Sequence, residues 1–286
     1  MTVIWAWADL GNHALQNYNI KQYWLIMSVL SVKKFNPEWK RVFVVDNITS
    51  EYIKSKKWDS LWDEIRIVDF HNTEYGDLYN IKIYSWPKLY SYGLIDDDIL
   101  ILDTDIVFLK EFDIPDRTKM CGQFYNYIHF TKQNSTTPQE KMTSLRNNWC
   151  KVERVFKKFE FYNICSDYIF EQSDICLVGA PIYVPRGLGK IVQQEVLEHI
   201  IECETLGGRT TFNIVKDVFF AIEEEYPIAH VGKKYAGLCC ISRKGYRHGF
   251  CGSCKLNLEE GFEKPEKILG MPVFDLYIKN KDLNIN

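Results

Sequence analysis

The first third of the chain alternates between short apolar runs and stretches with helical periodicity. Three apolar runs have the β-favouring composition of buried strands, at residues 2–8, 41–46 and 65–70. Between them, residues 19–34 repeat apolar side chains at helical spacing, and residues 49–62 form a more polar helix with Thr49 or Ser50 as N-cap. Strands and helices that alternate at this spacing predict βαβ units and a mostly parallel sheet.

A fourth apolar run of this kind ends in two carboxylates. Residues 81–92 predict a helix, with Pro87 causing a kink or the helix starting at Trp86. A buried strand at residues 99–102 follows and leads into Asp103-Thr104-Asp105, after which the chain is apolar again. Two carboxylates inside a buried segment are costly unless they are neutralised. A site for Mg²⁺ or Mn²⁺ is therefore favoured over a solvated surface turn.

The remaining elements are less regular. Strands are predicted at residues 120–127, 174–178 and 181–184, a polar excursion at 131–146, and helices at 187–203 and 212–225. The acidic run 223–225 is either solvated or places one Glu against a sugar hydroxyl. In residues 246–255, small residues separate His248 from Lys255, which predicts a tight loop around an anion.

Composition limits the possible functions. The 286 residues are 46% hydrophobic, enough for one large α/β domain or two small ones, and the net charge of −3 gives no case for nucleic acid or anionic membranes. Without a basic leader or an apolar stretch near ~18 residues, we expect no membrane span and a cytoplasmic protein. Nine cysteines indicate free thiols. Zinc binding by Cys239, Cys240, Cys251 and Cys254 stays open.

The end of the first strand is a candidate nucleotide site. Ala6-Trp7-Ala8-Asp9 places small residues and a carboxylate where open α/β sheets bind nucleotides. The loop lacks the glycine spacing of a dinucleotide site, and the alternative is an ordinary exit from a strand. Lys88 could meet either a diphosphate or the Asp pair, or it could be a plain surface lysine.

The segment YSWPKLYSYGLIDDDILILDTDIVF, residues 84–108, resembles the helix, strand and DxD core of nucleotide-sugar glycosyltransferases with the GT-A fold. The likeness is closest to family-8 enzymes of the lipopolysaccharide galactosyltransferase and glycogenin type. It implies an α/β fold with a Rossmann-like, mostly parallel sheet flanked by helices and a smaller acceptor-side subdomain. We expect one domain, with a nucleotide-binding half at 1–110, an acceptor and metal-completing half at 111–255, and a C-terminal extension at 256–286.

The resemblance also implies roles for individual residues. Metal ligands would be Asp103, Asp105 and His248, and nucleotide contacts would come from Ala6, Trp7, Ala8, Asp9, Lys88, Thr104, Gly252 and Lys255. In the family, a motif near the end of the chain combines a His, a Gly and a Lys, which His248, Gly252 and Lys255 resemble. The spacing here departs from that of the family by one residue at His248. His230 competes for the role, but its surroundings predict a helix. Asp174 and Glu224 would grip a sugar or act as a base.

The expected activity is transfer of a sugar from a nucleotide diphosphate donor, with UDP favoured, to a hydroxyl of a glycan or other acceptor. Mn²⁺ or Mg²⁺ would be the cofactor. A carboxylate-based glycoside or phosphodiester hydrolase is one alternative, although two-carboxylate hydrolysis needs groups ~5–9.5 Å apart across the bond. Asp103 and Asp105 leave the same side of one strand. The other alternative is an inactive sugar-nucleotide-binding domain.

Overall fold

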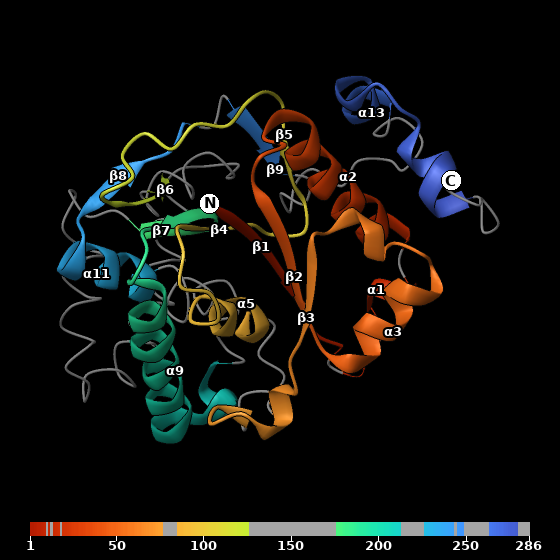
Figure 1. Ribbon diagram of the computed structural model, residues 1–286. Helices are drawn as coiled ribbons and strands as arrows, with labels where there is room; N and C mark the ends of the chain where they lie inside the picture. Colours follow the sequence, from red (N-terminus) through yellow and green to blue (C-terminus); the bar gives the residue numbers. More distant parts are fainter. Residues whose placement is uncertain are drawn as a thin grey trace, which may run out of the picture.

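A seven-stranded sheet forms the centre of the protein, in the order β3-β2-β1-β4-β7-β6-β8 (Figure 1). The computed structural model describes residues 1–9, 11, 14–17, 19–76, 85–125, 176–212, 226–242, 245–248 and 263–279. The strands are β1 (Thr2–Trp7), β2 (Lys40–Val45), β3 (Glu64–Ile67), β4 (Ile99–Ile101), β6 (Met120–Tyr125), β7 (Cys176–Val184) and β8 (Leu238–Cys240). Only β7 runs against its neighbours β4 and β6. The predicted mostly parallel sheet is confirmed.

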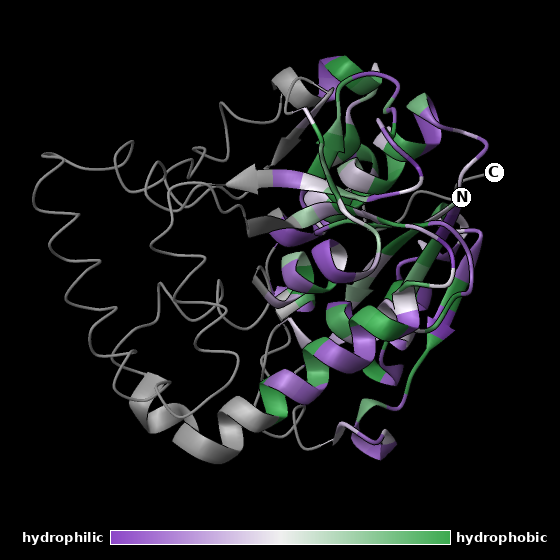
Figure 2. Ribbon diagram, turned by 90° about the vertical axis from the view of Figure 1, so that its left-hand side faces the viewer, coloured by the Kyte–Doolittle hydropathy of each residue, from purple (hydrophilic) through white to green (hydrophobic). Residues whose placement is uncertain are grey.

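Helices cover both faces of this sheet and enclose two hydrophobic cores (Figure 1). One face carries α2 (Asn19–Phe35), α3 (Asn47–Ser55) and the short α1 (Ala14–Asn17). The other face carries α5 (Trp86–Ser91), α9 (Gly189–Phe212) and α11 (Tyr226–Tyr235). Hydrophilic and hydrophobic residues alternate in bands along α9 (Figure 2), as expected of a helix with one face on the sheet and one in solvent. Among the described helices, none is both long and apolar enough to span a bilayer.

Helix α2 is buried almost all round because a C-terminal segment covers its outer side. This segment consists of α13 (Glu263–Leu269) and the π-helix η5 (Phe274–Lys279), which both pack on α2. The Lys34 ammonium donates hydrogen bonds to the carbonyls of Ile268 (2.8 Å) and Leu269 (3.1 Å), the last residues of α13. The prediction of an apolar stripe on one side of α2 therefore understated its burial.

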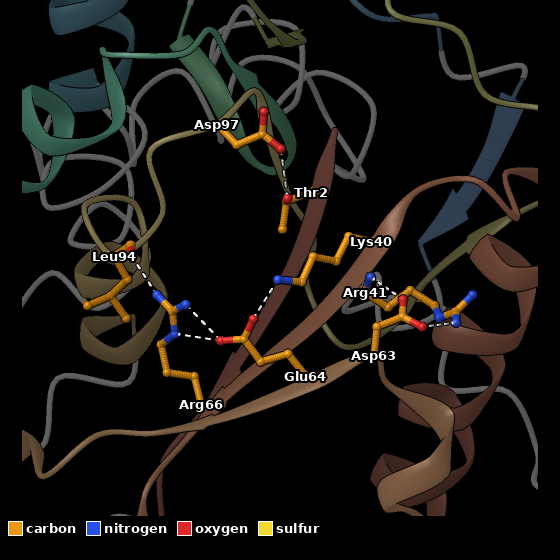
Figure 3. A network of polar contacts seen from close by, with 8 residues as sticks. All are labelled: Thr2, Lys40, Arg41, Asp63, Glu64, Arg66, Leu94 and Asp97. Atoms are coloured by element: carbon orange, nitrogen blue, oxygen red, sulfur yellow. Dashed lines mark hydrogen bonds and ion pairs between the residues drawn. The ribbon is translucent and has the colours of Figure 1, made fainter.

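The amino end of the sheet, where β1 to β4 begin, is held by pairs of opposite charge (Figure 3). Glu64 accepts from Lys40 at 2.6 Å and from Arg66 at 2.7 Å. These hydrogen bonds, with that of Lys40 the largest, lower the pKa of the Glu64 carboxyl. Just before β4, Asp97 accepts the hydroxyl of Thr2 at 2.9 Å. Carboxylates at this end of the sheet are thus structural.

Several predicted boundaries were wrong. The strands predicted at 174–178 and 181–184 are one strand, β7, which continues through Gly179 and Ala180 because both neighbouring strands pair with it. Helix α3 ends at Ser55 and not at residue 62, and the single-turn helix η1 (Asp59–Leu61) follows it. Helix α9 extends to Phe212, nine residues beyond its predicted end at 203. The third strand ends at Ile67, before the short helix η2 (Phe70–Asn72).

Other predictions were confirmed or fall outside the described residues. Helix α5 begins at Trp86 with Pro87 in its first turn, a position where proline costs no hydrogen bond. The polar excursion at 131–146 lies outside the described residues, as does the helix predicted at 212–225 apart from Phe212, which ends α9.

Candidate functional site

Aspartates gather at the carboxyl end of the sheet. Each of the four parallel strands β1, β2, β3 and β4 is followed within two residues by an aspartate, namely Asp9, Asp46, Asp69 and Asp103. The chain runs from β1 outward to β2 and β3, and then returns to place β4 on the other side of β1. This reversal between β1 and β4 is a topological switch point, where open α/β sheets leave a crevice for ligands. Asp9 and Asp103 flank it.

The first loop leaves β1 directly at this switch point. Ala6, Trp7 and Ala8 are partly exposed, whereas Asp9 is only 5% exposed. One Asp9 carboxylate oxygen accepts the N–H of Gly11 at 2.9 Å, which closes a tight turn. Gly11 adopts a φ of 82°, a left-handed conformation that favours glycine. The loop predicted to hold a nucleoside is therefore shaped by its own aspartate.

Asp46 ties this loop to the neighbouring strand. It ends β2 and is the N-cap of α3, where its Oδ1 accepts the N–H of Thr49 at 2.8 Å. Its Oδ2 accepts the N–H of Asp9 at 2.7 Å. The predicted N-caps, Thr49 and Ser50, lie inside the helix instead, because the chain becomes helical at Asn47 and Asp46 caps it there. An aspartate at the start of a helix was a visible signal in the sequence, but its link to Asp9 was not.

Asp103 and Asp105 lie on either side of a tight turn after β4. The Ile106 N–H donates to the Asp103 carbonyl at 3.2 Å, and Asp105 is 7% exposed. The ladder of β4 with β1 continues one residue beyond the strand, since the Leu102 N–H donates to the Ile4 carbonyl at 3.0 Å. Asp103 follows Leu102 directly and therefore lies beside the end of β1, where the first loop starts.

Lys88 reaches this turn from α5. Its ammonium lies 2.8 Å from Asp103 Oδ1, and the two side chains are 13% and 28% exposed. Of the three roles considered for Lys88, the structure shows contact with the Asp pair. The Lys88 ammonium is thus a cation in direct contact with the Asp103 carboxylate.

The backbone of His248 lies beside Asp105. Strand β5 (Ile106–Phe108) pairs antiparallel with β9 (Tyr246–His248), and this register places His248 opposite Ile106. Carboxylate and imidazole groups are donor types that suit Mn²⁺. For His248 the register fixes the position of the backbone alone.

Helix α2 fixes the strand that follows Asp105. The buried Ser31 hydroxyl accepts the N–H of Phe108 at 3.0 Å and donates to the Ser28 carbonyl at 2.7 Å. One turn further, the Asn36 side chain bonds both the N–H and the carbonyl of Phe112 at 3.2 Å. A strand of only three residues is thereby held in place by a buried helix.

His230 lies elsewhere. It is on α11, which packs against α9 and β7, and burial is the main cause that lowers the pKa of its imidazole. The helix predicted around His230 is confirmed, and the register of β9 places the backbone of His248, the preferred candidate, nearer to Asp105.

The other candidate residues are not described. Asp174, Glu224, Gly252 and Lys255 lie outside the described residues, as do Cys251 and Cys254. Cys239 and Cys240 are free thiols in β8, and burial raises the pKa of the neighbouring Cys121 thiol to about 12. Among the described side chains there is no group of three or more His, Cys, Asp or Glu residues that could hold a metal.

Comparisons with known proteins found a likeness in structure only. No protein-family model and no curated protein matches the sequence. Among solved structures, the chain is similar to the galactosyltransferase LgtC in complex with donor and acceptor sugar analogues, at 14% identity and a TM-score of 0.45 over 84% of this chain and 73% of that one. The PaToxG glycosyltransferase matches at 11% identity and 0.41, over 97% and 80%.

Mouse xyloside xylosyltransferase 1 is also similar, at 11% identity and a TM-score of 0.40 over 88% of this chain and 97% of that one. All three neighbours are glycosyltransferases by name. Identities of 11–14% assign no reaction to this chain, so its function is argued from its own residues.

Proposed function

We propose that this protein is a metal-dependent glycosyltransferase that moves a sugar from a nucleotide diphosphate donor, UDP first among the candidates, to a hydroxyl of a glycan or other acceptor. One observation carries the proposal: the Asp-x-Asp turn and the Ala6–Asp9 loop flank the β1/β4 switch point, where a nucleotide would enter. A nucleotide can then contact both the loop and the carboxylates. The two carboxylates are one residue apart in a single turn, which favours metal binding over hydrolysis across a wide gap.

Different residues would bind the metal and the nucleoside. Asp103, Asp105 and His248 would hold Mn²⁺ or Mg²⁺, which when bound neutralises charge on a diphosphate leaving group. The first loop, with Ala6, Trp7, Ala8 and Asp9, would bind and orient the nucleoside. Thr104 would contact the donor between the two aspartates.

Fixed positive charge would assist where negative charge develops. Lys88 is already at this end of the sheet, and its ammonium can exchange the Asp103 carboxylate for a phosphate oxygen. We propose the same role for Lys255, with Gly252 in the backbone of that loop. Asp174 and Glu224 are proposed to grip the acceptor or the donor sugar, or to act as a base.

Metal-dependent binding of nucleotide tests the proposal. Thermal unfolding is measured with UDP and with GDP, each with and without Mn²⁺, for the wild type, Asp105→Asn and Asp113→Asn. A ligand at about 100 times its Kd stabilises by about 2.7 kcal/mol, so we expect a rise of several degrees for the wild type with UDP and Mn²⁺. Asp105→Asn should lose the part that depends on Mn²⁺.

The control variant changes an exposed aspartate on the same segment, eight residues after Asp105, and should behave as the wild type. If neither nucleotide gives a shift that depends on Mn²⁺, the transferase proposal is wrong. Binding without turnover of a panel of nucleotide sugars would instead support the inactive sugar-nucleotide-binding domain. Release of UDP from one sugar of the panel would identify the donor.

A further inference from the structure

We propose that Asp46 positions the nucleotide-binding loop, and that it acts on the nucleoside end of the donor and not on the metal end. This inference rests on the proposed function and deepens it, because it assigns the shape of the first loop to a residue on the neighbouring strand. Asp46 would touch no substrate. It would act through the backbone of Asp9.

The two oxygens of Asp46 have separate tasks. Oδ1 accepts the Thr49 N–H at 2.8 Å and so caps α3, while Oδ2 accepts the Asp9 N–H at 2.7 Å. The residue is 7% exposed, so neither bond competes with much water. Hydrogen bonds from a backbone N–H to a carboxylate are among the short, strong ones. A single buried carboxylate therefore joins the start of α3 to the loop after β1.

The position of this link decides what it controls. The parallel register pairs Trp7 with Val45, so Ala8 and Asp46 are the first residues beyond the paired strands. At this point the backbone of β1 is no longer held by the ladder, and the Asp9 N–H is fixed by Asp46 instead. Asp9 then places its own carboxylate against the Gly11 N–H. The link thus sets the direction of the loop two residues after the end of β1.

The metal end is connected to the rest of the protein by other elements. Asp103 and Asp105 follow β4, on the other side of β1, and β5 is held by α2 through Ser31. Loss of the Asp46 link should therefore weaken contacts to the nucleoside and leave contacts to the diphosphate intact. A residue needed only for general stability would weaken both equally.

Two substitutions remove the link and keep the helix cap. Asn and Ser cap helices about as well as Asp, so Asp46→Asn and Asp46→Ser can still accept the Thr49 N–H. In Asp46→Asn an amide N–H₂ faces the Asp9 N–H, and in Asp46→Ser the second oxygen is missing. The matched control is Asp63→Asn, since Asp63 accepts both the backbone N–H of Arg41, at 2.8 Å, and its guanidinium at the opposite end of β2.

Kd values are measured by calorimetry for UDP with Mn²⁺ and for inorganic pyrophosphate with Mn²⁺. We expect Kd for UDP to rise about tenfold in both Asp46 variants, as fits loss of one hydrogen bond to a charged group. Kd for pyrophosphate should stay at the wild-type value, and Asp63→Asn should change neither. Equal weakening of both ligands, or unchanged binding of UDP, would overturn the inference.

A second measurement separates this inference from the proposed function. Amide hydrogen exchange at Asp9 is followed in the free protein, where no nucleotide is needed. It should be faster in Asp46→Asn than in the wild type, and unchanged exchange would overturn the positioning role. If the wild type binds neither UDP nor GDP while exchange at Asp9 still responds, the proposed function fails and the structural link stands.

Discussion

Replacement of Lys88 by Met should affect binding of the metal and of the nucleotide in opposite directions. In the free protein the ammonium lies 2.8 Å from Asp103 Oδ1. A divalent cation that binds Asp103 must displace this ammonium or share the carboxylate with it. Lys88→Met removes the competing charge and keeps much of the apolar stem of the side chain. We therefore expect tighter binding of Mn²⁺ and weaker binding of UDP with Mn²⁺.

The burial of the pair sets the size of the effect. Exposed ion pairs contribute up to about 1 kcal/mol, whereas removal of one partner from a buried pair costs about 3–5 kcal/mol. Lys88 and Asp103 are 13% and 28% exposed, between these limits and nearer the first on the Asp103 side. An interaction of about 1–2 kcal/mol corresponds to about 5- to 30-fold in affinity. Kd for Mn²⁺ alone should fall by that factor in Lys88→Met.

Titration of the free protein with Mn²⁺, followed by the electron spin resonance of unbound Mn²⁺, measures this Kd directly. The control is Lys40→Met, which removes a lysine that lies 2.6 Å from a carboxylate, that of Glu64, at the opposite end of the sheet. It should leave binding of Mn²⁺ unchanged. If Lys88→Met also leaves Kd for Mn²⁺ unchanged, the ammonium does not compete with the metal, and the assignment of Asp103 as a ligand loses its support.

Two further predictions concern stability. Ser31→Ala should lower the free energy of unfolding, measured in urea, by about 1–3 kcal/mol, because the buried Phe108 N–H loses its acceptor. The control Ser55→Ala, at an exposed hydroxyl, should change this free energy by no more than about 0.5 kcal/mol. Equal effects of the two substitutions would exclude the role given to Ser31. Burial lowers the pKa of His230 in the folded protein below its ordinary value. The neutral imidazole should therefore contribute stability above the unfolded pKa of about 6.5, and this contribution should be lost as the pH falls through the folded pKa. Between pH 5 and 8, the free energy of unfolding in urea should depend less steeply on pH in His230→Gln than in the wild type. Identical slopes would refute the lowered pKa of His230.

The sequence predicted those parts of the fold that depend on neighbouring residues. Alternation of apolar runs and helical stretches was sufficient for the parallel part of the sheet, for α2 and for α5. The Asp-x-Asp turn was visible because two carboxylates interrupt an apolar segment, and the same reasoning applies to any buried charge. Local patterns carry this information since they report which side chains face the core.

Features that depend on distant residues could not be predicted. Nothing in residues 246–248 indicates that β9 pairs with β5, because both strands are three residues long and far apart in the chain. The link from Asp46 to Asp9 depends on the parallel register of β1 with β2. Burial of α2 from both sides depends on a segment near the end of the chain.

The two ends of the sheet use aspartate and glutamate differently, and this difference connects stability to function. At the amino end, Glu64 and Asp97 meet lysine, arginine and hydroxyl side chains that belong to the fold. At the carboxyl end, Asp46 uses backbone N–H groups, and Asp103 meets the Lys88 ammonium, which comes from a helix. A bound cation would add positive charge at this acidic end, and a ligand that binds only the folded state also stabilises it. The proposed metal site and the stability of the carboxyl end of the sheet are therefore coupled.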